Sequence, residues 1–185
     1  FVRSFDLDSE QISGIGRRVA QLVASAVGLP LTVGDINRLK RQETSNFEAF
    51  DLLLRGHNAL RQENKAATDE AIRLFEETID ADRLFARAYE GLAVAHMSAQ
   101  QWADASRSAR AFEAAQRAVA LDDRLSAAHS ILGASYLAER DFDRALQSAE
   151  KAVVVNPNDA DGYAMLGRIL NWTGSPERGE EEIEK

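Results

Sequence analysis

The 185-residue sequence contains no cysteine. Disulfide bonds, thiolate metal ligands and cysteine nucleophiles are therefore excluded. Proline and glycine are sparse, with 3 and 11 residues, and so few helix-breaking residues favour long helices. The longest apolar stretch, around residues 19–31, is too short and too interrupted for the roughly 20 residues of a membrane-spanning helix. We therefore expect no membrane insertion by this chain.

The chain has fewer basic than acidic residues, with 22 lysines and arginines and 30 aspartates and glutamates, so its net charge is −8. Nucleic-acid binding depends on cationic side chains that neutralise phosphates. The densest basic cluster, Arg38, Lys40 and Arg41, is short and has no interleaved aromatic residues. We therefore predict no nucleic-acid partner. The expected compartment is the cytoplasm, with the periplasm left open because a cysteine-free chain suits either.

Motifs of catalysis and metal binding are also missing. The histidines, His57, His96 and His129, are isolated from one another, and no His-x-x-x-His pair occurs. Gly14 and Gly16 lie inside a helical pattern and do not follow a strand, as a phosphate-binding loop would. We predict that the chain is not an enzyme and has no catalytic, cofactor-binding or metal-binding residues.

A repeat is present instead. Residues 126–159 have the apolar pattern of two short helices separated by an acidic turn, and neither helix has enough apolar surface to fold alone. Gly133 recurs 34 residues later as Gly167. His129 and Tyr163 lie four residues before these two glycines, and Tyr89 lies four residues before Ala93 in the same way. A period of this length predicts a stacked array of helix pairs.

The 34-residue period with these small, alanine and proline positions resembles the tetratricopeptide repeat (TPR). The resemblance implies an all-α fold, a helix-turn-helix repeat superhelix or α-solenoid. Four copies align, at 49–85, 86–125, 126–159 and 160–185, and the last is truncated.

The residues ahead of the array carry a second resemblance. The order of FDLDSEQI, an amphipathic helix, a short basic helix and RQETSNFEAFDLLLRG is similar to the C-terminal region of bacterial class III adenylate/guanylate cyclase-type proteins. It implies that residues 1–8 are the last strand of an upstream α/β domain and that residues 9–48 form an N-terminal helix and a linker helix. The chain would then be a piece of a larger bacterial signalling protein, in which it is a non-catalytic interaction or regulatory module. Similar arrays follow winged-helix domains, so the sensor region of such a regulator and a self-association scaffold are alternatives.

The ligand surface follows from the array, because the first helices of stacked pairs line its concave side. We expect a protein or peptide segment there, supplied by another protein or by the parent chain. Projection of the repeats places these residues in the predicted groove: Phe50, Leu53, His57, Arg87, Glu90, Val94, Ala127, Ser130, Ala134, Ala164, Arg168 and Asn171.

The composition of the predicted groove suggests its ligand. Leu53 and Val94 offer apolar contacts, Arg87 and Arg168 offer guanidinium forks for a carboxylate, and the third copy contributes only small side chains. We expect a segment with apolar and acidic residues. A solvated, empty groove with the partner on the convex face is an equal alternative.

The truncated fourth copy predicts an uncovered apolar end formed by Ala164, Leu166, Ile169 and Leu170. We expect this end either to fray or to be covered by another molecule, and the second outcome makes a homo-oligomer through the C-terminal end a further candidate. Trp172 ends the same predicted helix, and both core packing and ligand contact are open for it.

Overall fold

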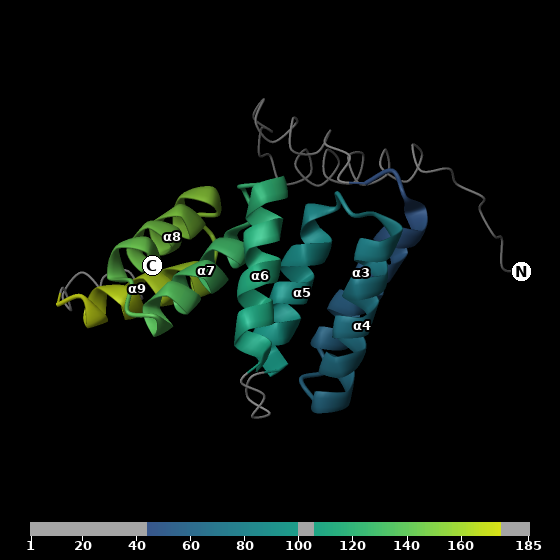
Figure 1. Cartoon of the computed structure of the whole chain (residues 1–185), viewed down its shortest axis with the longest axis horizontal. Coiled ribbons are helices and arrows are strands. Elements are labelled where there is room, and N and C mark those ends of the chain that lie inside the picture. The colour runs from purple at the N-terminus through teal and green to yellow at the C-terminus, as the bar shows by residue number, and fades with distance from the viewer. Residues whose placement is uncertain (1–43, 100–105, 175–185) are drawn as a thin grey trace, which may run out of the picture. The chain divides into compact units, whose positions relative to one another are not determined.

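The computed structural model of the chain (Figure 1) describes residues 44–99 and 106–174. The chain divides into two compact units, residues 1–47 and 48–185, and nearly all of the described residues belong to the second. The strand predicted for residues 1–8 and the helices predicted within residues 9–43 lie outside the described residues.

Every regular element in the described ranges is an α-helix. The helices are α3 (Phe47–Leu60), α4 (Lys65–Ala81), α5 (Ala86–Ala99), α6 (Ser106–Leu121), α7 (Ser126–Ala138), α8 (Phe142–Val155) and α9 (Ala160–Trp172). Each contacts its neighbour along the chain from α4 onward, and the alternate helices α5, α7 and α9 also contact one another in turn. The all-α helical repeat solenoid predicted from the sequence is therefore confirmed.

The turns inside two of the helix pairs have the same construction. Asn64 caps α4 by accepting a hydrogen bond from the Ala67 N–H at 3.0 Å. Asp141 caps α8 by accepting one from the Arg144 N–H at 3.1 Å. The residue before each cap has a left-handed backbone, with φ of 48° at Glu63 and 61° at Arg140. A side-chain cap satisfies a backbone donor that the first helical turn leaves free, so local sequence determines where these second helices begin.

The turns between successive pairs also repeat. At each of them an Asp or Asn side chain accepts a hydrogen bond from the backbone N–H two residues later, which is the hydrogen bond of an Asx-turn. The pairs are Asp82 with Leu84 (3.0 Å), Asp122 with Arg124 (3.1 Å) and Asn156 with Asn158 (3.3 Å).

The predicted equivalence of Tyr89 and His129 is visible in their contacts. Tyr89 Oη donates a hydrogen bond to the carbonyl oxygen of Arg83 at 3.3 Å. His129 Nε2 lies 2.8 Å from the carbonyl oxygen of Asp123. Both side chains reach back six residues to the preceding turn, so one repeat position ties a first helix to the loop in front of it.

The core is built largely from small residues. Alanines of the facing helix sides are fully buried, among them Ala71, Ala88, Ala93, Ala111 and Ala149. Small side chains allow packed helices to reach the short end of the usual interaxial range of about 8–10 Å. The alanine content of the sequence therefore serves close packing of the pairs.

Phe75 on α4 is one of the large side chains in this core, and it is completely buried. It lies against two glycines of the first helices. A Cβ atom at Gly56 would be 2.7 Å from its Cε1 atom, and one at Gly91 would be 2.5 Å from the same atom. Because real Cβ atoms do not approach that closely, both glycines are required to accommodate this ring.

Gly133 on α7 has a different environment. A Cβ there would lie 3.4 Å from the Ala145 carbonyl oxygen and 3.6 Å from the Ala149 backbone nitrogen. These are contacts with the α8 backbone, so α7 and α8 approach closely, as the sequence predicts. The distances are ordinary van der Waals separations for a methyl group, however, and only a larger side chain would overpack.

The prediction of an uncovered apolar end on α9 is wrong for most of its residues. Leu166, Ile169 and Leu170 are 6%, 0% and 2% exposed. They form a core cluster with Ala145 and Ala149 of α8. The α7–α8 pair already covers this face of α9, and only Ala164 of the predicted set is exposed.

Candidate functional site

A trough opens along three alternate helices, α5, α7 and α9, and has a volume of about 310 Å³. From α5 it is lined by Val94, Met97 and Ser98, and from α7 it is lined by Ala127, Ser130, Ile131 and Ala134. Asp161, Ala164, Met165 and Arg168 line it from α9, and Asp159 lines it from the position just before that helix. These twelve residues are called the trough below.

The structure brings half of the predicted groove residues together in this trough. They are Val94, Ala127, Ser130, Ala134, Ala164 and Arg168. The small side chains of α7 and α9 leave the space open, because alanine extends only a methyl group into it. That these residues bind a ligand stays a prediction.

The other predicted groove residues lie elsewhere. Leu53 is only 1% exposed and belongs to the core of the first pair, so the prediction that it offers an apolar contact to a ligand is wrong. Phe50 is half-buried against the same core. Arg87 and Glu90 are half-buried on α5, and Asn171 is exposed on α9, but none of these three lines the trough.

His57 is half-buried and lies edge-on to Phe75, with ring centroids 5.2 Å apart. Burial lowers the pKa of His57 below its ordinary value of 6.5, and the nearby charges of Arg87 and Arg61 lower it further. The imidazole is therefore neutral at pH 7. The charge of Arg87 thus affects His57, which lies outside the trough. Arg87 and Arg168 were predicted to hold a carboxylate together, but only Arg168 lines the trough.

The sequence interpretation missed six trough residues, namely Met97, Ser98, Ile131, Asp159, Asp161 and Met165. Spacing could have identified some of them. Met97 and Ser98 follow Val94 by three and four residues, and residues at that spacing lie on the same side of a helix. Asp159 precedes its helix, and no helical period could have predicted its place.

Charge in the trough is mixed. Asp159 precedes α9 as its N-cap residue, but its side chain makes no capping hydrogen bond. Across the described ranges, the side chains of Asp159, Asp161 and Arg168 have no hydrogen bond or ion pair. Two carboxylates and one guanidinium group are thus available to a ligand.

Ser130 supplies an unsatisfied polar group. It lines the trough from α7 and is 8% exposed. Its Oγ atom is shielded from solvent and has no hydrogen-bond partner within the described part of the chain. An unpaired buried hydroxyl costs about 1–3 kcal/mol relative to one that is satisfied.

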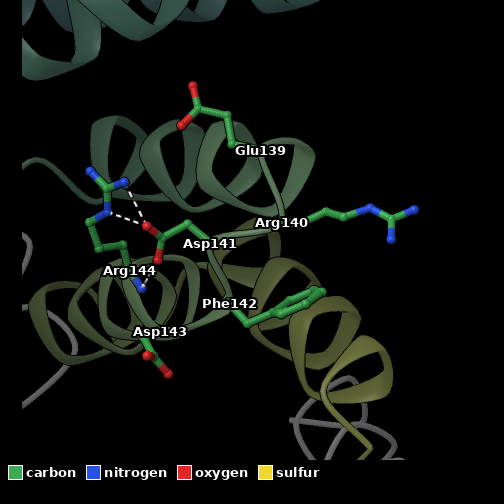
Figure 2. Close-up of a pocket in the computed structure, with 6 residues that line it drawn as sticks. All are labelled: Glu139, Arg140, Asp141, Phe142, Asp143 and Arg144. Atoms are coloured by element: carbon green, nitrogen blue, oxygen red, sulfur yellow. Dashed lines mark hydrogen bonds and ion pairs between the residues drawn. The ribbon is translucent and has the colours of Figure 1, made fainter.

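A second hollow lies at the turn between α7 and α8, lined by residues 139–144 (Figure 2). Figure 2 shows the Arg144 side chain directed at Asp141, and the two form an ion pair at 2.6 Å. This hydrogen bond from Arg144 is the main cause that lowers the pKa of Asp141. The Arg144 guanidinium also lies 4.4 Å from the centroid of the Tyr136 ring. Asp141 and Arg144 therefore serve the helix cap, and nothing about this hollow indicates catalysis.

A third hollow, of about 400 Å³, contains the aromatic residues Phe142 and Trp172. Trp172 is 67% exposed, so core packing, one of the two roles considered for it, does not apply. Phe142 is 36% exposed, and Leu137 and Ala138 complete the apolar wall. Self-association through this end of the chain stays a prediction.

The described ranges offer neither a metal site nor a membrane span. No cluster of three or more His, Asp or Glu side chains there has the arrangement of a metal site. Within the same ranges, none of the helices combines the length and the apolar character of a membrane span.

No protein-family model matches the chain. A protein of Rhizobium meliloti (strain 1021) named "Putative adenylate cyclase 3" is 28% identical over 145 residues. The match includes 76% of this chain and 25% of that protein, so the chain spans about a quarter of the relative's length.

Solved structures share the architecture. The first TPR of Spaghetti (RPAP3), bound to the HSP90 peptide SRMEEVD, is 23% identical, with a TM-score of 0.59 over 73% of this chain and all of that one. TTC0263, a thermophilic TPR protein of Thermus thermophilus, is 20% identical, with a TM-score of 0.60 over 74% of this chain and 71% of that one.

The paired helices, the alanine-rich core and these likenesses show that the described part of the chain has the fold of a TPR-type solenoid.

Proposed function

We propose that this chain is a non-catalytic interaction module that holds a protein segment in the trough between α5, α7 and α9. The observation that carries the proposal is the row of small residues Ala127, Ala134 and Ala164, which keeps the trough open beside apolar walls. The likeness to a TPR domain that binds a peptide supports a peptide-sized ligand.

The parent protein is proposed to be a cytoplasmic bacterial cyclase-type signalling protein. The support is the 28% identity to the Rhizobium protein, together with the order of segments ahead of the repeats. In this arrangement the module recruits or senses a partner, or holds a segment of its own parent chain, and chemistry takes place elsewhere in the parent protein.

Site-specific photocrosslinking in the full-length protein tests the surface. Two exposed alanines on different helices form a matched pair: Ala164 lies in the trough and Ala120 lies on α6 outside it. Benzoylphenylalanine at position 164 is expected to capture one defined protein segment, identified by mass spectrometry, and the same residue at position 120 is not. Adducts from position 120 with none from position 164 would place the ligand elsewhere.

A blocking substitution gives the complementary result. Ala164→Arg fills the trough from an exposed position and leaves the core untouched. It is expected to abolish capture by a photocrosslinker at position 134, while Ala120→Arg leaves that capture unchanged. Equal capture in both variants contradicts the proposal.

A further inference from the structure

We infer that the trough binds a segment that carries a lysine or arginine beside an apolar side chain. This inference rests on the proposed function and identifies the chemistry of its ligand. It reverses the acidic ligand expected from Arg87 and Arg168, because those two residues do not meet in the trough.

The charges in the trough favour a basic ligand. Asp159 and Asp161 place two carboxylates at the α9 end of the trough, against the single guanidinium of Arg168. None of the three side chains is paired with another group in residues 44–99 or 106–174. A ligand that covers carboxylates removes them from water, and this is favourable only when a cation replaces the lost hydration. The overall charge of −8 also attracts a basic segment over longer distances.

Ser130 favours a ligand with a hydrogen-bonding group. Its Oγ atom is shielded and has no partner in the structure's described part, although the residue lines the trough. Ser135, on the same helix, donates its hydroxyl to the Ile131 carbonyl oxygen at 2.9 Å. Ser130 does not make this bond within its own helix, and a ligand that turns the Ser130 hydroxyl toward the trough offers it the hydrogen bond that it lacks.

The walls of the trough favour an apolar side chain in the ligand. Val94 and Met97 on α5, Ile131 on α7 and Met165 on α9 line the trough with apolar side chains. Methionine adapts to irregular partners, so these walls suit one inserted aliphatic or aromatic residue. The cation that pairs with Asp159 and Asp161 then lies next to it along the segment.

Selection of phage-displayed random dodecapeptides on the 185-residue chain tests the inference. Clones are first sorted by whether they lose binding to Ala164→Arg and keep it with Ala120→Arg, which restricts the analysis to trough ligands. The expected trough ligands have a net positive charge, with lysine or arginine adjacent to an apolar residue.

The charge contacts are then measured by calorimetry with one selected peptide. Asp159→Asn combined with Asp161→Asn is expected to weaken its Kd about threefold to tenfold, the range for two partly exposed ion pairs. The Asp159 side chain makes no capping hydrogen bond, so the start of α9 does not depend on its carboxylate. Asp143→Asn combined with Glu150→Gln removes the same charge from exposed positions on α8 and is expected to change the Kd less than about twofold.

The outcomes separate the two proposals. Acidic trough ligands, or equal losses in the two double variants, overturn the basic-ligand inference and leave the trough as the binding surface. If no selected clone depends on position 164, the proposed function itself is contradicted, and the inference fails with it.

Discussion

The α3–α5 region and the α5–α9 region repeat one helix order but differ in how the space along their first helices is filled. In the first, Phe75 projects from α4 between Gly56 and Gly91, and Leu53 and His57 pack around it. In the second, alanines at 127, 134 and 164 leave a trough of about 310 Å³. Equivalent repeat positions therefore stabilise the core in one region and present a surface in the other.

The glycines show the same contrast. A Cβ atom at Gly56 or Gly91 would collide with the Phe75 ring, whereas a Cβ atom at Gly133 would meet the α8 backbone at ordinary contact distances. A glycine on a first helix thus has two physical causes. Substitutions distinguish them.

The largest effect is expected for Gly91→Ala. Its new Cβ would lie 2.5 Å from Phe75 Cε1, and that ring is completely buried. The free energy of unfolding should fall by about 1–3 kcal/mol, measured by urea unfolding. Phe75→Leu in the same chain removes part of the obstacle, so the double variant should be less unstable than the sum of the single variants. If the losses of the two single variants simply add in the double variant, Gly91→Ala does not act through a collision with Phe75.

Gly133→Ala is expected to have a smaller effect of opposite sign. The added methyl group meets its nearest neighbour at 3.4 Å, and alanine in a helix interior is favoured over glycine by about 0.5–1 kcal/mol. The urea midpoint should therefore stay the same or rise. A loss as large as that of Gly91→Ala would mean that α7 and α8 tolerate no Cβ at this position.

The smallest expected effect is a pH dependence that originates in the first region. Burial lowers the pKa of His57 in the folded state below 6.5, the ordinary value that applies in the unfolded chain. Below pH 6.5 the unfolded chain therefore binds a proton at His57 more readily than the folded chain does. The stabilising contribution of neutral His57 is complete above pH 6.5 and is lost as the pH falls through the lower folded pKa. The loss of unfolding free energy between about pH 7 and pH 5 should be smaller in His57→Gln than in the original chain. Equal losses in the two chains would exclude His57 as a source of this pH dependence.

Much of the fold was predictable because it is periodic. The recurrence of Gly133 at Gly167 and the equivalence of Tyr89 and His129 identify the repeat, and the contacts of Tyr89 and His129 with preceding turns follow that pattern. Small residues on α7 and α9 likewise predicted where space remains. Half of the predicted groove residues line the trough for this reason.

The remainder depended on packing that a period does not encode. Leu53 occupies a groove position by alignment, yet the aromatic core around Phe75 buries it. Leu166, Ile169 and Leu170 were expected at an open end, but α8 alanines cover them. Asp159 enters the trough from a turn, and only the three-dimensional path of the chain places it there.

The central claim is that ligand binding belongs to the α5–α9 region and that the α3–α5 region supplies stability. Amide chemical shifts of the ¹⁵N-labelled chain, recorded while a selected dodecapeptide is added, test it most directly. The account predicts shifts at residues 127–134 and 159–168, with residues 50–57 unchanged. Shifts confined to α3 and α4, with the trough residues unaffected, would contradict it.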